Sequence, residues 1–294
     1  MKEFFKGSCV ALITPFKDGG VDKESLVKLI EYQLENKTDA ILVLGTTGEP
    51  PTMSQEEKEL VIKTAREVIG SRAKLIVGTG ANSTASAIAN SLKAKELCAD
   101  ALLVVTPYYN KCTQKGIIAH YKAIAEASKL PIIAYNVPGR TGVNITVETA
   151  VSLSEIEQIV GLKEASGNIN QIVALCKALK GKMAVYSGDD SLNYTCMTLG
   201  ASGAISVTAN ILPKETKEVL DLCFAGNFAA ALEKHEALLD VNKNLFIEVN
   251  PIPVKYASKL LGLTNGEVRL PLTELEDKNK EILEKTLRDF NVKF

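Results

Sequence analysis

The amino-acid sequence predicts an α/β protein, a (β/α)8 TIM barrel with a C-terminal helical extension. The chain of 294 residues is long for an ordinary single domain and normal for such a barrel. Short apolar segments begin roughly 19 to 34 residues apart, which is the length of a strand plus a returning helix. Segments such as Ala101–Val105 are apolar throughout, which indicates strands buried on both faces of a parallel sheet. An open doubly wound sheet is the competing architecture, because strand number alone does not separate the two.

The expected strands alternate with amphipathic helices. In chain order, the strands are Cys9–Ile13, Ala40–Leu44, Lys74–Gly78, Ala101–Val105, Ile132–Asn136, Ile159–Lys163, Ala184–Ser187 and Gly203–Val207. Residues 54–57, Ser-Gln-Glu-Glu, form a capping box before the helix that follows the second strand. Strand patterns stop after about Asn227, and helical patterns cover residues 228–246, 254–262 and 273–290. We therefore expect a catalytic barrel over residues 1–226 and a helical domain over residues 227–294.

The composition excludes several classes of function. Hydrophobic residues make up 46% of the chain, and its net charge is −1. A protein that binds nucleic acid or an anionic membrane surface usually presents a basic face, so we expect neither partner. The first residues lack the apolar core of an export signal. Six scattered cysteines with no CxxC pair indicate reduced thiols in a cytoplasmic protein and no metal site.

Polar residues follow several expected strands, at the end of a barrel where active sites form. The second strand is followed by GTTGE, in which Thr46 and Thr47 lie between two glycines. Such a turn can direct backbone N–H groups toward an anion, although an ordinary tight turn has the same pattern. The fourth strand is followed by TPYYN at 106–110, whose paired tyrosines suit rim packing as well as catalysis.

The fifth strand leads into YNVPGRTG at 135–142. Only five of the 34 basic residues are arginines, so Arg140 in a loop of the active face is informative. A planar guanidinium binds a carboxylate through two hydrogen bonds, which lysine cannot do. A single loop arginine is, however, commonly an ordinary surface ion-pair partner.

The sixth strand places Lys163 at its end, within GLKEASG at 161–167. Burial disfavours a charged ammonium, and a neutral amine is the nucleophile that attacks a ketone to form a Schiff base. The alternative is a lysine that extends to the barrel rim and pairs with a neighbour such as Glu164. Tyr135 ends the adjacent strand, where its phenol can transfer the protons of imine formation. This neighbour favours the catalytic interpretation.

These four motifs, in this order and at this spacing, resemble the pyruvate-dependent class I aldolase family. The resemblance extends over essentially the whole chain, including SGDD at 187–190 and GAISV at 203–207. It implies a TIM barrel in which Lys163 forms a Schiff base with pyruvate, with no metal and no cofactor. It also implies a proton relay of Tyr135, Thr46 and Tyr109. Tyr109 would enter the neighbouring active site of a homotetramer, a dimer of dimers.

The resemblance further implies residues that bind the substrates. Thr47, together with Thr46, matches the positions that hold the pyruvate carboxylate. Gly188 and Ile205 match positions whose backbones line the pocket. Arg140 is typical of members that condense pyruvate with L-aspartate 4-semialdehyde, the first committed step of diaminopimelate and lysine biosynthesis. There it holds the carboxylate of the semialdehyde, a small substrate that a fork of donors can orient.

Lysine-sensitive members of the family bind L-lysine in a cleft between two subunits. The matching positions here are Pro50, Pro51, Gln55, Lys58, Asn82, Ser86 and Tyr108. Asn82 and Tyr108 agree with the sensitive pattern, whereas sensitive enzymes carry histidine and glutamate in place of Lys58 and Ser86. The lost carboxylate and the added positive charge both disfavour a cationic ligand. We therefore predict weak or absent inhibition by L-lysine.

Three alternatives remain open from the sequence. The first is an N-acetylneuraminate or 2-keto-3-deoxy acid aldolase of the same family, against which Arg140 argues. The second is a keto-acid-binding barrel that has lost activity, since fold does not fix function. The third is a phosphate-binding barrel isomerase, for which TANILPK at 208–214 gives little support.

Overall fold

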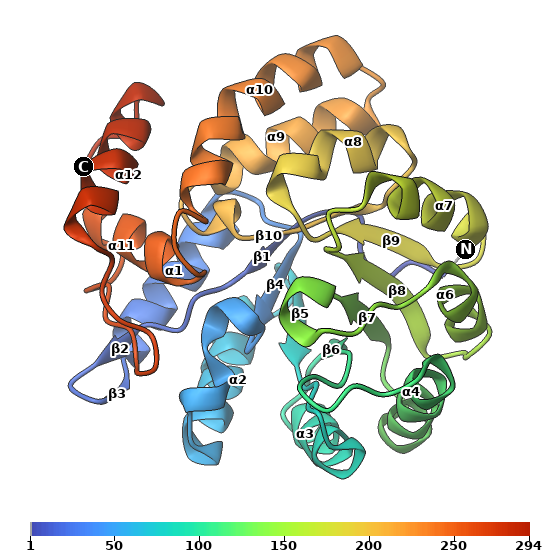
Figure 1. Cartoon of the computed structure of the whole chain (residues 1–294). Helices are drawn as coiled ribbons and strands as arrows, with labels where there is room; N and C mark the ends of the chain where they lie inside the picture. The colour runs from blue at the N-terminus through green and yellow to red at the C-terminus, as the bar shows by residue number, and fades with distance from the viewer. Residues whose placement is uncertain (1) are drawn as a thin grey trace.

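Eight parallel strands close into a barrel in the computed structural model, which describes residues 2–294 (Figure 1). The strands are β1 Gly7–Ala11, β4 Ala40–Val43, β5 Lys74–Gly78, β6 Ala101–Val105, β7 Ile132–Asn136, β8 Ile159–Glu164, β9 Ala184–Ser187 and β10 Gly203–Ser206. They lie side by side in chain order, and β1 pairs with both β4 and β10. This closure confirms the predicted TIM barrel and rules out the open sheet. Each predicted strand is present, with its ends within two residues of the expected ones.

Helices surround the barrel in the described part of the chain (Figure 1). The helices between strands are α1 Lys23–Glu35, α2 Gln55–Ile69, α3 Thr84–Glu96, α4 Gln114–Ser128, α5 Pro138–Thr141, α6 Val147–Ser154, α7 Ile169–Leu179 and α8 Asn193–Thr198, and α9 Pro213–Phe224 follows β10. The predicted capping box is present, because the backbone N–H of Glu57 donates to Ser54 Oγ and that of Ser54 donates to Glu57 Oε2. A small hairpin of β2 Phe16–Lys17 and β3 Gly20–Val21 was not predicted, since two-residue strands carry no periodic signal.

Side chains inside the barrel form a core distinct from the one between strands and helices. This inner cluster includes Cys9, Leu42, Ile76, Ile133, Tyr186 and Ile205. Gly161 on β8 faces the Tyr186 ring, and a Cβ atom there would lie 2.7 Å from the ring. Only glycine leaves room for this aromatic side chain. The amino-terminal part of the barrel is therefore packed solid, and the opposite end is left for a cavity.

Three further helices, α10 Phe228–Asn244, α11 Ile252–Leu260 and α12 Asp277–Asp289, follow the barrel as predicted. Their buried side chains, such as Leu238 and Val254, belong to the same hydrophobic cluster as Leu12 and Ile13 of the barrel. The predicted boundary after residue 226 falls between α9 and α10. The division into two domains stays a prediction. Within the described residues, none of the helices has both the length and the apolar character needed to cross a membrane.

Candidate active site

Lys163 and Tyr135 occupy paired positions on neighbouring strands. The strand register places Tyr135 of β7 opposite Lys163 of β8. The lysine is only 5% exposed, and its Nζ lies 4.3 Å from the centre of the Tyr135 ring. Gly188 follows β9 at close approach, since a Cβ atom there would lie 3.0 Å from Lys163 Cε. The strands therefore hold an amine against a phenol ring, and a glycine keeps space for the lysine chain.

Glu164 is not the partner of Lys163, because successive side chains of a strand point to opposite faces. Its carboxylate, which is buried, accepts hydrogen bonds from Asn136 Nδ2 at 2.9 Å and from the backbone N–H of Ser166 at 2.7 Å. The alternative in which Lys163 pairs with Glu164 is therefore wrong. Lys163 lies toward the barrel interior, near Cys9. Desolvation by burial raises the pKa of the Cys9 thiol, and the positive charge of Lys163 opposes part of this shift.

A cavity of about 500 Å³ opens at the carboxyl ends of β4 to β7. Thr46, Tyr135 and Arg140 all line it, together with Gly78–Ala81 after β5. Part of its wall comes from the C-terminal segment, through Val249, Asn250, Pro251, Pro271 and Leu272. The volume is typical of a site for small metabolites. Of the predicted strand-end residues, Thr46, Tyr135 and Arg140 therefore share one concave site. The cavity lining does not include Lys163, Thr47, Gly188 or Ile205.

The two threonines of GTTGE have different environments within a 3-10 turn, Thr46–Gly48. Thr46 is exposed and lines the cavity, whereas Thr47 is buried and its Oγ1 accepts a hydrogen bond from Asn250 Nδ2 at 2.9 Å. The backbone carbonyl of Asn250 also accepts a bond from Arg140 Nη2 at 3.5 Å. Asn250 Oδ1 is buried and has no hydrogen-bond partner among residues 2–294, so it leaves an acceptor unused in a residue that lines the cavity.

Asn250 was missed from the sequence. The only local signal is the Asn-Pro-Ile-Pro run at 250–253, which interrupts the helical pattern without indicating a site. Its contacts with Thr47 and Arg140 join segments about 200 and 110 residues away, respectively, and no local pattern encodes such contacts.

Arg140 lies in the short helix α5, directly after β7. Its side chain is exposed, and it forms no ion pair with any carboxylate of residues 2–294. The alternative in which Arg140 is an ordinary surface ion-pair partner is therefore wrong within one chain. A guanidinium that lines a cavity with unused donors is suited to an anionic ligand.

The paired tyrosines after β6 lie in different places. Tyr108 lines the cavity, whereas Tyr109 is 92% exposed and has a φ of 73°. A positive φ is uncommon for an aromatic residue and indicates that the backbone is held in this form. Within one chain, Thr46 and Tyr135 line the cavity, and Lys163 adjoins it only through its contact with the Tyr135 ring. Neither Lys163 nor Tyr109 belongs to the cavity lining.

The remaining predicted positions divide between the barrel and its rim. Ile205 is buried on β10 in the inner barrel cluster. Lys58 and Tyr108 both line the cavity, as do Pro50, Pro51 and Gln55. Asn82 and Ser86 are exposed at the start of α3 and do not belong to the cavity lining. The candidate regulatory positions therefore adjoin the candidate active site, on the same rim as Tyr109.

The sequence model of the dihydrodipicolinate synthetase family matches residues 4–290. The chain belongs to the dihydrodipicolinate synthetase family. This membership confirms the resemblance inferred from the four motifs. The family's characterised relatives supply the comparison for the site.

Members of the dihydrodipicolinate synthetase family resemble the chain over almost its full length. A 4-hydroxy-tetrahydrodipicolinate synthase of Geotalea uraniireducens is 49% identical over 288 residues, which are 98% of this chain and 99% of the relative. The crystal structure of dihydrodipicolinate synthase from Aquifex aeolicus is 49% identical, with a TM-score of 0.96 over 98% of this chain and 99% of that one. A chloride-inhibited dihydrodipicolinate synthase from Acinetobacter baumannii, complexed with pyruvate, is 51% identical, with a TM-score of 0.96 over 98% and 100%.

The phosphate-isomerase alternative fails on the structure as well as on family membership. The segment 208–214 is mostly buried and starts with a 3-10 turn, Thr208–Asn210. Thr208 Oγ1 donates to Asn242, and Asn210 Nδ2 donates to the carbonyl of Ala11. These polar groups already have partners inside the protein, so they offer no phosphate loop.

Across residues 2–294, all six cysteines are free and no cluster of three or more His, Cys, Asp or Glu side chains has the arrangement of a metal site.

Proposed function

We propose that the chain catalyses the 4-hydroxy-tetrahydrodipicolinate synthase reaction, in which pyruvate condenses with L-aspartate 4-semialdehyde through a Schiff base on Lys163. The observation that carries this proposal is the buried amine of Lys163, which lies 4.3 Å from the centre of the ring of Tyr135, a residue that lines the cavity. Arg140, a guanidinium without an ion-pair partner among the described residues, provides the second substrate site. The names of the relatives and the pyruvate complex of the Acinetobacter enzyme support the choice of substrates.

The first step is imine formation. Lys163 attacks the keto carbon of pyruvate, and the oxygen leaves as water after it takes up protons. Tyr135 is the group on the adjacent strand that can transfer these protons, with Thr46 as the next member of the relay. We propose that Thr47 and Thr46 hold the pyruvate carboxylate and that the backbones of Gly188 and Ile205 line the pocket. The close approach of Gly188 to the lysine chain and the position of Ile205 in the inner barrel cluster support this assignment.

The second step makes the carbon–carbon bond. Loss of a methyl proton converts the imine into an enamine, because the imine nitrogen accepts the electron pair. This role of the imine is why we propose that no cofactor takes part. The enamine carbon attacks the aldehyde of the semialdehyde, whose carboxylate Arg140 holds. The amino group of the substrate then displaces Lys163 as the ring closes, and this exchange returns the free amine.

Tyr109 completes the relay from another copy of the chain. Its 92% exposure and its position outside the cavity lining support a role in the neighbouring site of a homotetramer built as a dimer of dimers. The positive φ of Tyr109 fixes its backbone in a form that supports a contact with the neighbouring subunit. We place the enzyme in the cytoplasm, on the ground that all six cysteines are free thiols.

Turnover measurements test the proposal. Purified enzyme is assayed with pyruvate and L-aspartate 4-semialdehyde, and in parallel for the cleavage of N-acetylneuraminate and of a 2-keto-3-deoxy acid. We expect condensation to exceed either cleavage reaction by orders of magnitude. Faster cleavage of a sugar acid would support the aldolase alternative, and absence of any turnover would support the keto-acid-binding barrel.

A further inference from the structure

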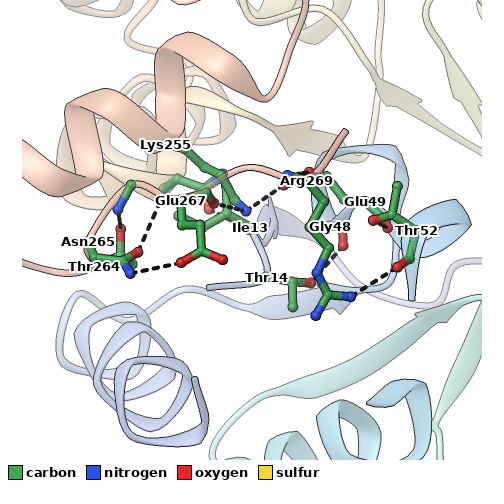
Figure 2. Close-up of polar contacts among 12 residues, drawn as sticks. Ile13, Thr14, Gly48, Glu49, Thr52, Lys255, Thr264, Asn265, Glu267 and Arg269 are labelled. Atoms are coloured by element: carbon green, nitrogen blue, oxygen red, sulfur yellow. Dashed lines mark hydrogen bonds and ion pairs between the residues drawn. The ribbon is translucent and has the colours of Figure 1, made fainter. Parts of the chain in front are cut away.

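The last residue of GTTGE forms a buried ion pair that the proposed mechanism does not use. Glu49 directly follows the 3-10 turn of the threonines, has a φ of 54° and is buried. Its carboxylate pairs with Lys255 Nζ, from the helix α11 in the C-terminal segment. Lys255 is only 1% exposed. Figure 2 shows the lysine reaching toward the turn from the helix above it.

The lysine is held from several directions. Lys255 Nζ donates to the carbonyl of Glu267 at 2.8 Å and lies 4.1 Å from the centre of the Phe16 ring. Burial lowers the pKa of Lys255 to about 8, while the attraction of Glu49 acts in the opposite direction. The ammonium therefore has only protein groups around it, and its position is fixed by them.

Arg269 closes the same network from the outside. Its guanidinium lies 3.9 Å from the centre of the Phe16 ring, on which Lys255 also rests, and binds both carboxylate oxygens of Glu57 at 2.6 and 2.8 Å. Its backbone N–H donates to Glu49 Oε2 at 3.3 Å (Figure 2). Lys255 and Arg269 of the C-terminal segment thus both bind Glu49, the residue that ends the threonine turn.

A buried ion pair is poor evidence for stability, because desolvation offsets most of the Coulomb attraction. Its directional bonds do fix the position of what they join. The backbone N–H of Glu49 donates to the carbonyl of Thr46 at 3.2 Å, so the carboxylate and the turn move together. At the same end of the turn, Thr14 Oγ1 donates to the carbonyl of Gly48 at 2.7 Å. The C-terminal end of the turn is therefore held by two separate segments.

We propose that Glu49 and Lys255 are positioning residues that hold the Thr46–Thr47 turn in the geometry required to bind the pyruvate carboxylate. This inference rests on the proposed function of the cavity. It gives the C-terminal segment a role in the reaction, since α11 supplies the cation and Asn250 just before it binds Thr47. Loss of the pair is expected to impair pyruvate capture more than binding of the semialdehyde.

The test compares Lys255→Met, the double variant Glu49→Gln/Lys255→Met and a control. The double variant removes both charges at nearly constant volume, so no unpaired charge is left to unfold the protein. Lys217→Met is the control, because Lys217 binds Asp39 at 2.8 Å and Asp39 precedes β4 at the amino-terminal end of the barrel. Urea unfolding of each variant separates folding defects from kinetic ones.

We expect kcat/KM for pyruvate to fall at least roughly tenfold in the double variant, because small misplacements of a binding group are costly. The KM for the semialdehyde should change less than about threefold, and Lys217→Met should keep both values. A folded double variant with wild-type kcat/KM for pyruvate would overturn the inference, as would an equal loss in Lys217→Met.

A crystal structure of the double variant tests the positioning role independently of which substrate the enzyme uses. We expect the 2.9 Å bond between Asn250 Nδ2 and Thr47 Oγ1 to break as the turn shifts. An unchanged turn would contradict the positioning role even if the wild-type enzyme proved to have a different substrate. Absence of wild-type turnover, by contrast, would contradict the proposed function alone.

Discussion

The Nζ atom of Lys163 lies 4.3 Å from the centre of the Tyr135 ring, and the two residues face each other in the register of β7 and β8. Strand pairing fixes this relationship, so it does not depend on any loop. The residue after the lysine, Glu164, is turned to the opposite face and bonds to Asn136. The neighbour of the amine is therefore the Tyr135 ring, which lines the cavity, and not the carboxylate of Glu164.

Arg140 offers a test of the second substrate site. Arg140→Ala is expected to raise the KM for L-aspartate 4-semialdehyde roughly ten- to hundredfold, because hydrogen bonds to a charged group contribute about 1.5 to 3 kcal/mol. Arg140→Lys should recover little of this loss, since an ammonium cannot bind a carboxylate through a planar fork. Steady-state kinetics with each substrate varied in turn measure the effect. Normal kinetics of Arg140→Ala would point back to the aldolase alternative.

Tyr109 can be assigned to its own or a neighbouring site by mixing two inactive variants. Subunits that carry Tyr109→Phe and subunits that carry Lys163→Ala are unfolded together and refolded. If Tyr109 serves the neighbouring site, a hybrid dimer contains one site with both native residues. Random pairing then restores roughly a quarter of the sites. No recovery of activity in a mixture that forms hybrids would mean that Tyr109 acts within its own chain.

Inhibition by L-lysine is expected to be weak. Lys58 lines the same cavity as Tyr108 and adds a positive charge, and Ser86 supplies no carboxylate for the ammonium groups of the ligand. The double variant Lys58→His/Ser86→Glu should increase the sensitivity. Initial rates over a range of L-lysine concentrations measure it. A half-inhibiting concentration well below millimolar in the wild type would show that the two positions do not decide the response.

Lys255 predicts a specific dependence of stability on pH. Burial lowers its pKa to about 8, with Glu49 and Glu267 opposing the shift and Arg269 adding to it. Between about pH 8 and the ordinary lysine pKa near 10.4, the unfolded chain binds more protons at this residue than the folded chain. This residue alone therefore makes the free energy of unfolding rise with pH across that window.

The measurement is urea unfolding of the wild type and of Lys255→Met. The difference in their free energies of unfolding should grow by about 1 to 2 kcal/mol between about pH 7.5 and 9.5. Lys217→Met serves as the control: burial acts to lower the pKa of Lys217, but Asp39 and Asp221 raise it overall, so it titrates above this window. A difference that stays constant or shrinks would contradict the shifted pKa of Lys255.

The sequence predicts the barrel well because its signals are local. Each strand is an apolar run followed by a polar turn, and barrel closure places the carboxyl ends of all the strands on one face, with β7 and β8 adjacent. The adjacency of Tyr135 and Lys163 followed from this rule, and the strand register confirms it. The sequence does not predict the hydrogen-bond partners of Glu164. Which face of the sheet its side chain occupies depends on where the strand begins.

What the sequence does not predict comes from contacts between distant segments. Glu49 was read as part of a glycine-rich turn, whereas its partner Lys255 lies in a helix more than 200 residues later. Asn250 has no motif of its own and becomes part of the site through Thr47 and Arg140. No periodicity or spacing encodes such pairs, and they appear only when α11 packs against the barrel.

The central claim is that the amine of Lys163 captures pyruvate, and borohydride trapping tests it most directly. The enzyme is incubated with pyruvate and sodium borohydride, digested and analysed by mass spectrometry, with Lys163→Ala and a sample without pyruvate as controls. We predict a reduced pyruvyl adduct on the peptide that contains Lys163 and on no other. An unmodified peptide, or an adduct on a different lysine such as Lys255, would contradict the mechanism.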